Sequence, residues 1–128
     1  MERKVIKTAK APLPIGPYNQ AVVVGHLVYC SGQIPVDPKT NEVCSGGVAE
    51  QAQVVLENVK NVLQAAGSSL SQVVKATVFL KDMNDFAAMN KVYAEYFEAA
   101  NAPARSTIEV ARLPKDVLVE IEVVAAVN

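Results

Sequence analysis

The sequence is poor in the residues that usually carry metal or nucleophile chemistry. It contains one histidine, His26, and two cysteines, Cys30 and Cys44, which form no CxxC pair. A zinc site needs a cluster of His, Cys or carboxylate ligands, and a Ser-His-acid triad needs a well-placed histidine. His26 follows Gly25 in a stretch typical of a two-residue hairpin turn, where a histidine is usually solvated. We therefore expect no metal site and no catalytic triad, and we interpret Cys30 as a core residue.

Charge and long apolar runs are also scarce. Twelve Lys and Arg residues against thirteen Asp and Glu residues leave a net charge of -1, and no basic block occurs along the chain. Proteins that bind nucleic acids usually concentrate basic residues on one surface, so the composition argues against a nucleic-acid partner. Residues 1–10 are charged, and no uninterrupted apolar run approaches the roughly 18 residues of a membrane-spanning helix. We expect a cytoplasmic protein with no membrane segment.

What the sequence does contain is an alternation of strand and helix patterns that predicts one domain over residues 1–128. Short β-branched runs predict strands, and apolar residues at spacings of three and four predict two amphipathic helices. The order βββαβαββ predicts an α/β (α+β) fold, with two helices on one face of a mixed sheet of about six strands. The expected elements are a strand at Val5 and Ile6, a hairpin turning at Gly25 and His26, a helix over 48–66 with Gly67 as its C-cap, a strand over 73–81, a helix over 86–100, and strands over 106–113 and 116–127.

The last expected strand is apolar on both faces, although two helices can cover only one face of the sheet. An uncovered apolar face needs a partner, and the chain has no further helix to provide one. We therefore expect a homo-oligomer whose subunits pack through their sheets. The apolar residues are Val117, Val119, Ile121, Val123 and Ala125 on one face, and Leu118, Val124 and Ala126 on the other.

Two charged residues in this closing region require an explanation. Glu120 lies among residues that are expected to be buried, where a carboxylate needs a cationic partner or a function. Arg105 precedes the penultimate strand, and if the last two strands pair as a hairpin it lies opposite a residue beyond 120. The two charges then meet as diagonal neighbours, or across an interface between copies. They form either a plain ion pair, or a site in which the guanidinium binds a carboxylate and the glutamate activates water.

Five segments together resemble the RidA (YjgF) family of enamine/imine deaminases. The resemblance implies a chorismate-mutase-like subunit in a homotrimer, with active sites between subunits and no cofactor. It also implies hydrolysis of reactive 2-imino acids, such as 2-iminobutanoate and 2-iminopropanoate, to 2-oxo acids and ammonia. The segments are APLPIGPYNQAV (11–22), CSGQIPVDPKT (30–40), QAQVVLENVKNVLQAAG (51–67), VVKATVFLKDMNDFAAMNKVYAEYF (73–97) and PARSTIEVARLPKDVLVEIEVVA (103–125).

The resemblance assigns roles to both charged residues and to a tyrosine. The carboxylate-binding arginine of the family matches Arg105, and the glutamate associated with the attacking water matches Glu120. Tyr18 matches a tyrosine that lines the cleft. Without the resemblance, Tyr18 is interpreted equally well as an aromatic anchor behind a Gly16-Pro17 turn.

Four further residues match positions that approach the substrate. Ser31 and Gly32 match positions where backbone and hydroxyl groups come close to it, and Asn90 matches a cleft asparagine. Thr107 stands where many relatives have cysteine and is expected to contribute mainly backbone groups. Asn41 replaces a common turn glycine, and asparagine also adopts the left-handed conformation.

Two other functions remain open at this point. A protein that binds 2-oxo acids or related carboxylates without catalysis would use Arg105 equally well, but it would not need Glu120. RNA cleavage is associated with some eukaryotic members of the family. The near-neutral charge gives RNA binding little electrostatic support.

Overall fold

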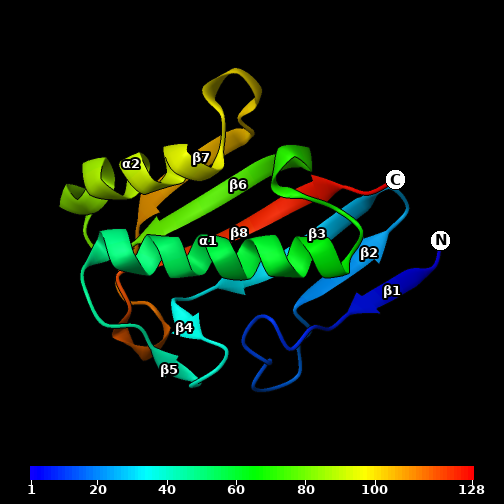
Figure 1. Cartoon of the computed structure of the whole chain (residues 1–128), viewed down its shortest axis with the longest axis horizontal. Helices are drawn as coiled ribbons and strands as arrows, with labels where there is room; N and C mark the ends of the chain where they lie inside the picture. The colour runs from blue at the N-terminus through cyan, green and yellow to red at the C-terminus, as the bar shows by residue number, and fades with distance from the viewer.

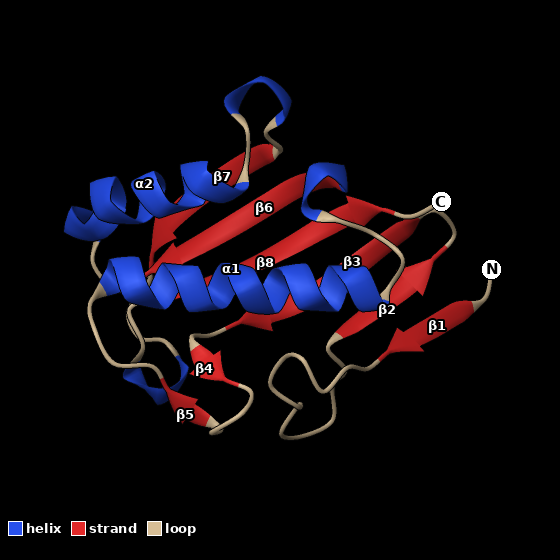
Figure 2. Ribbon diagram, in the orientation of Figure 1, coloured by secondary structure: helices blue, strands red, loops and turns tan.

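The computed structural model describes residues 1–128 and confirms a mixed sheet with both helices on one face (Figure 1, Figure 2). Six strands form one sheet in the order β1-β2-β3-β8-β6-β7, in which only the β6–β7 pair is parallel. The elements are β1 (Arg3–Ile6), β2 (Ala21–Val24), β3 (Leu27–Gln33), β4 (Val36–Asp37), β5 (Glu42–Val43), α1 (Val48–Ala65), β6 (Val73–Leu80), α2 (Phe86–Tyr96), β7 (Ala104–Glu109) and β8 (Val119–Ala126).

Helix α1 follows the predicted apolar stripe and covers the middle of the sheet (Figure 1). Its first turn is capped by Glu50, whose carboxylate accepts a hydrogen bond of 2.8 Å from the Gly47 N–H. Gly67 follows the helix with a φ of 79°, the left-handed conformation that commonly ends helices. The residues of α1 with no exposed surface are Ala52, Val55, Leu56, Val59, Val62 and Leu63, and those of β8 are Val119, Ile121 and Ala125. These side chains form the core between helix and sheet.

The predicted hairpin of the last two strands is wrong. Strands β7 and β8 are not neighbours, because β6 lies between them and pairs with both. The physical reason is the helical connection: α2 returns the chain to the starting end of β6, so β7 runs parallel beside β6. Strand β8 then enters the sheet between β3 and β6.

This topology separates Arg105 from Glu120. Arg105 pairs with the buried Ala76 and shares the helix-covered face, whereas Glu120 pairs with Phe79, whose side chain lies on the opposite face. The expectation that the two residues are diagonal neighbours is therefore wrong, and within one chain they lie on opposite faces of the sheet.

The face without helices carries several apolar side chains among polar ones. Tyr29 is 50% exposed there, and Phe79, Val124 and Ala126 are half-buried. Glu122 is the exposed charge on the same face of β8. As the sequence predicts, both helices lie on the opposite side of the sheet (Figure 2). Neither helix is long and apolar enough to cross a membrane.

Candidate functional site

Arg105 is held against one face of α2. Its Nη1 donates a hydrogen bond of 2.7 Å to Oδ1 of Asn90, and its Cζ lies 4.6 Å from the ring centroid of Tyr93 and 5.6 Å from that of Phe86. Phe86, Asn90 and Tyr93 are four and three residues apart, a spacing that places them on one side of a helix. Two aromatic faces and one amide therefore fix the plane of the guanidinium.

Arg105 has no acidic partner in the chain, because the one ion pair present joins Arg112 and Asp116. A guanidinium carries five N–H donors in a rigid fork, and here one bond to Asn90 is the only hydrogen bond it makes. Its remaining donors are available to an external acceptor. A carboxylate matches this fork geometry better than any other common biological acid except phosphate.

Two buried hydroxyls near Arg105 have no hydrogen-bond partner, Oη of Tyr93 and Oγ1 of Thr107. Thr107 is two residues from Arg105 on the same strand, so both side chains lie on the face toward α2. Burial raises the pKa of Tyr93, and the neighbouring Arg105 charge opposes this shift only in part. Tyr93 is therefore a neutral phenol at physiological pH.

Glu120 lies on the other face, against β3. Burial, and then the neighbouring charge of Glu122, raises the pKa of Glu120. Its carboxylate rests on Gly32, where an added Cβ would collide with Oε2. Gly32 lies at a register shift in the pairing of β3 with β8. Because residue 32 is a glycine, it leaves the space that the Glu120 carboxylate occupies.

Tyr18 and Ser31 belong to the same side of the molecule as Gly32. The Ser31 hydroxyl donates a hydrogen bond of 2.6 Å to the Asn19 carbonyl, and the Ser31 N–H donates one of 2.9 Å to the Gln20 carbonyl. Ser31 therefore attaches the loop that carries Tyr18 to strand β3. The Tyr18 side chain is half exposed, and it lines a cavity together with Gly32.

The structure thus divides the expected site residues into two groups. Asn90, Arg105 and Thr107 come together on α2 and β7, whereas Tyr18, Ser31, Gly32 and Glu120 gather around the end of β3. No cluster of three or more His, Cys, Asp or Glu side chains is placed to hold a metal ion.

Sequence reasoning missed the role of two aromatic residues. Phe86 and Tyr93 were predicted only as part of the apolar stripe of α2, but they form the surface on which Arg105 lies. The spacing of these two residues around Asn90 was the sequence signal that could have indicated this role. It indicates a shared helix face, but it does not indicate which strand residue packs there.

The comparisons with known proteins agree with this fold. A family model described as Endoribonuclease L-PSP matches residues 8–127. A RutC family protein from Pyrococcus abyssi is 56% identical over 125 residues, which are 98% of this chain and 98% of the relative. A 2-iminobutanoate/2-iminopropanoate deaminase from Escherichia coli is 54% identical, covering 95% of this chain and 96% of the relative. The crystal structure of Escherichia coli TdcF with bound serine has a TM-score of 0.91 and 50% identity, covering 98% of this chain and 99% of that one.

Proposed function

The chain belongs to the family described as Endoribonuclease L-PSP, the RidA (YjgF) family that its sequence resembles, and from this premise we propose that it is an imine deaminase. Its substrates are small 2-imino acids such as 2-iminobutanoate and 2-iminopropanoate, which it hydrolyses to 2-oxo acids and ammonia. The observation that carries the proposal is Arg105, a guanidinium fixed by α2 whose donors have no acidic partner. Such a group binds the carboxylate common to all these substrates.

The reaction requires both groups of site residues at one ligand. Because Arg105 and Glu120 lie on opposite faces of one chain, we propose that edge strand β7 of one copy approaches the uncovered face of another copy. Each site then takes Arg105 from one subunit and Glu120 from its neighbour. A closed ring of such unlike contacts is a cyclic homo-oligomer, and we propose a trimer.

In the proposed mechanism Arg105 clamps the substrate carboxylate while Glu120 holds a water against the imine carbon. Glu120 accepts a proton as the water oxygen bonds to that carbon, giving a carbinolamine. The substrate is the protonated imine, so this carbinolamine is neutral at its amino group. Glu120 passes the proton to the amino group, the carbon–nitrogen bond breaks, and the departing ammonia takes the hydroxyl proton, which leaves the 2-oxo acid and ammonium. The raised pKa of Glu120 makes its carboxylate a stronger base than that of an ordinary glutamate. No cofactor enters the reaction.

A coupled assay tests the proposal. Threonine dehydratase releases the enamine and imine from threonine, and semicarbazide traps the imine that has not yet hydrolysed. We expect the protein to reduce the amount of trapped imine in proportion to its concentration. If folded protein leaves the trapped imine unchanged, the proposed activity is wrong.

Replacing one residue of the uncovered face tests the shared site. We expect Val124→Asp to give a monomer, because burying the aspartate charge in a sheet-to-sheet interface costs more free energy than the interface contacts contribute. Imine hydrolysis should be lost with the oligomer, since each site needs two copies. Gln53→Asp, an exposed position on α1, is the matched control and should sediment like the wild type. A fully active Val124→Asp monomer in sedimentation velocity would contradict the arrangement.

Gly32 offers a test that leaves every polar group of the site in place. We expect Gly32→Ala to lower kcat at least about tenfold, because the added methyl group takes the space of the Glu120 carboxylate. Gly47→Ala is the control, since the nearest atom to its added Cβ is 3.7 Å away. Equal kcat values in the Gly32→Ala and wild-type proteins would show that the Glu120 position is unimportant.

A further inference from the structure

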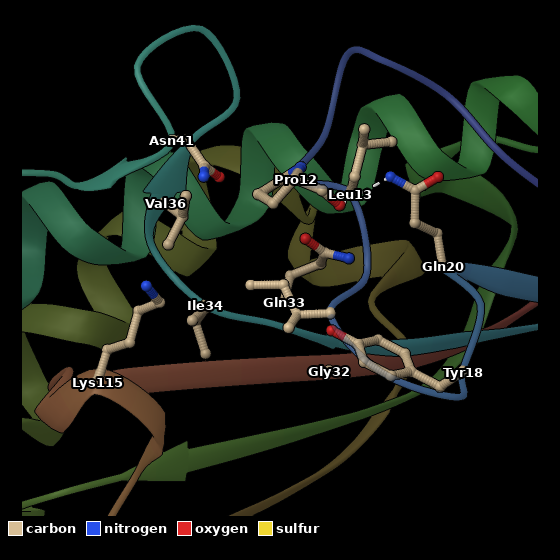
Figure 3. Close-up of a pocket in the computed structure, with 11 residues that line it drawn as sticks. Pro12, Leu13, Tyr18, Gln20, Gly32, Gln33, Ile34, Val36, Asn41 and Lys115 are labelled. Carbon is tan, nitrogen blue, oxygen red and sulfur yellow. Dashed lines mark hydrogen bonds between the residues drawn. The ribbon is translucent and has the colours of Figure 1, made fainter.

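A cavity of about 70 Å³ lies beside Tyr18 and Gly32, between the N-terminal loop and the end of β3 (Figure 3). The proposed mechanism assigns no step to any of its polar groups. Leu13, Ile15, Ile34 and Val36 give it apolar walls. The remaining lining residues are Pro12, Gln20, Gln33, Asn41 and Lys115.

Gln33 contributes a side-chain amide to the cavity lining. The residue as a whole is only 5% exposed, and it lies at the cavity wall. The neighbouring buried amide of Gln20 makes four hydrogen bonds to Thr8, Ala11 and Pro12, which fix the N-terminal loop. Figure 3 shows the Gln33 amide in the middle of the lining residues. Because an amide has both donors and an acceptor, Gln33 can hydrogen-bond to a ligand in the cavity.

Lys115 brings a positive charge to the same cavity. Its side chain extends toward Val36 in Figure 3, and its ammonium has no carboxylate partner, because Asp116 is paired with Arg112. Lys115 and Asp116 both have a φ of 56°, a conformation that costs energy outside glycine and asparagine. No acidic residue lines the cavity. The cavity therefore favours a group that accepts hydrogen bonds or carries negative charge.

The size of the cavity limits the ligand. One water-sized group occupies roughly 10–15 Å³ of such volume, so the cavity holds about five non-hydrogen atoms. A side chain of two methylene groups ending in an amide or a carboxylate has this number of atoms. Its methylene groups match the apolar walls, and its planar end matches Gln33 and Lys115.

We propose that this cavity receives the side chain of the 2-imino acid and that Gln33 and Lys115 select side chains ending in an amide or a carboxylate. The inference rests on the proposed imine hydrolysis. It adds a preference for substrates of the glutamine and glutamate type over aliphatic side chains of the same length. Gln33 and Lys115 are then specificity-determining residues, whereas Arg105 and Glu120 serve every substrate.

The test compares imines made in place by amino-acid oxidases from glutamine, glutamate, norleucine and alanine. For wild-type protein we expect kcat/KM for the glutamine imine to exceed that for the norleucine imine by about tenfold, the effect of one or two hydrogen bonds. Gln33→Leu should remove this preference and leave the alanine imine unchanged. Lys115→Met, at an exposed position, should lower the rate with the glutamate imine most, because a carboxylate pairs with the ammonium.

Two outcomes overturn the inference without touching the proposed activity: equal use of the glutamine and norleucine imines, or equal loss for all four imines in both variants. If no imine is hydrolysed, the proposed function is wrong. The cavity is then tested alone by calorimetric binding of 2-oxoglutarate and 2-oxohexanoate. A preference for 2-oxoglutarate that disappears in Lys115→Met supports the cavity assignment, and equal binding overturns it.

Discussion

Arg105→Ala should lose nearly all imine hydrolysis, and Arg105→Lys should lose at least about 100-fold in kcat/KM. The alanine variant removes the only guanidinium that α2 fixes in place, so the substrate carboxylate loses its fork of donors. The lysine variant keeps the positive charge but lacks the planar guanidinium group. An ammonium cannot stack on Tyr93 while it binds a carboxylate bidentately. Misplacing a substrate by about 1 Å can cost about 100-fold in rate.

The measurement is steady-state hydrolysis of the threonine-derived imine with each variant. Arg112→Ala is the matched control, since Arg112 is exposed and contacts only Asp116, and exposed ion pairs contribute little. Sedimentation of all variants verifies that the oligomer is intact. Near-normal turnover in both Arg105 variants would contradict the assigned role.

Glu120→Gln should lower kcat by about 100-fold to 10,000-fold while ligand binding is kept, the range expected for a general base. Glutamine has the shape of glutamate and can still hold a water above Gly32, but it accepts no proton from that water. A non-catalytic carboxylate-binding protein has no need of this proton transfer. Full binding of 2-oxobutanoate with lost turnover therefore separates the deaminase from the carboxylate sensor, and unchanged turnover would remove Glu120 from the mechanism.

The pH dependence gives a second readout for Glu120. Because its pKa is raised, the carboxylate becomes protonated at a higher pH than an ordinary glutamate, and activity should fall as the pH falls through that value. Glu122→Gln is the informative control. Removing the Glu122 charge lowers the pKa of Glu120, so the acid limb of the pH profile should move to lower pH. If the acid limb of the Glu122→Gln profile coincides with that of the wild type, Glu120 is not the titrating group.

Local pattern was sufficient to predict the elements that depend on neighbouring residues. The spacing of apolar residues predicted α1, and Gly25 and His26 were correctly placed at the turn between β2 and β3. Asn41 has the expected left-handed conformation, with a φ of 62°. The predictions were less accurate where tertiary packing determines the bounds of an element. Helix α2 ends at Tyr96 because Phe97 has extended backbone angles, and β4 and β5 are two-residue strands too short to show a period.

The order of strands in the sheet, and with it the geometry of the site, could not be predicted from the sequence. Strands that follow each other along the chain usually pair, and this preference led to the incorrect hairpin of β7 and β8. Asn90 was expected in the cleft through the resemblance, and the structure places it on Arg105. Gln33 was missed because a glutamine at a strand end resembles any other polar residue until the cavity that it lines is known.

The most direct test mixes two inactive proteins. Arg105→Ala and Glu120→Gln subunits are unfolded together, refolded and assayed for hydrolysis of the threonine-derived imine. If each site takes Arg105 from one subunit and Glu120 from another, roughly a quarter of the sites in a random mixture regain both groups, and about that fraction of wild-type activity should return. A mixed oligomer that assembles normally and stays inactive would contradict a site shared between copies.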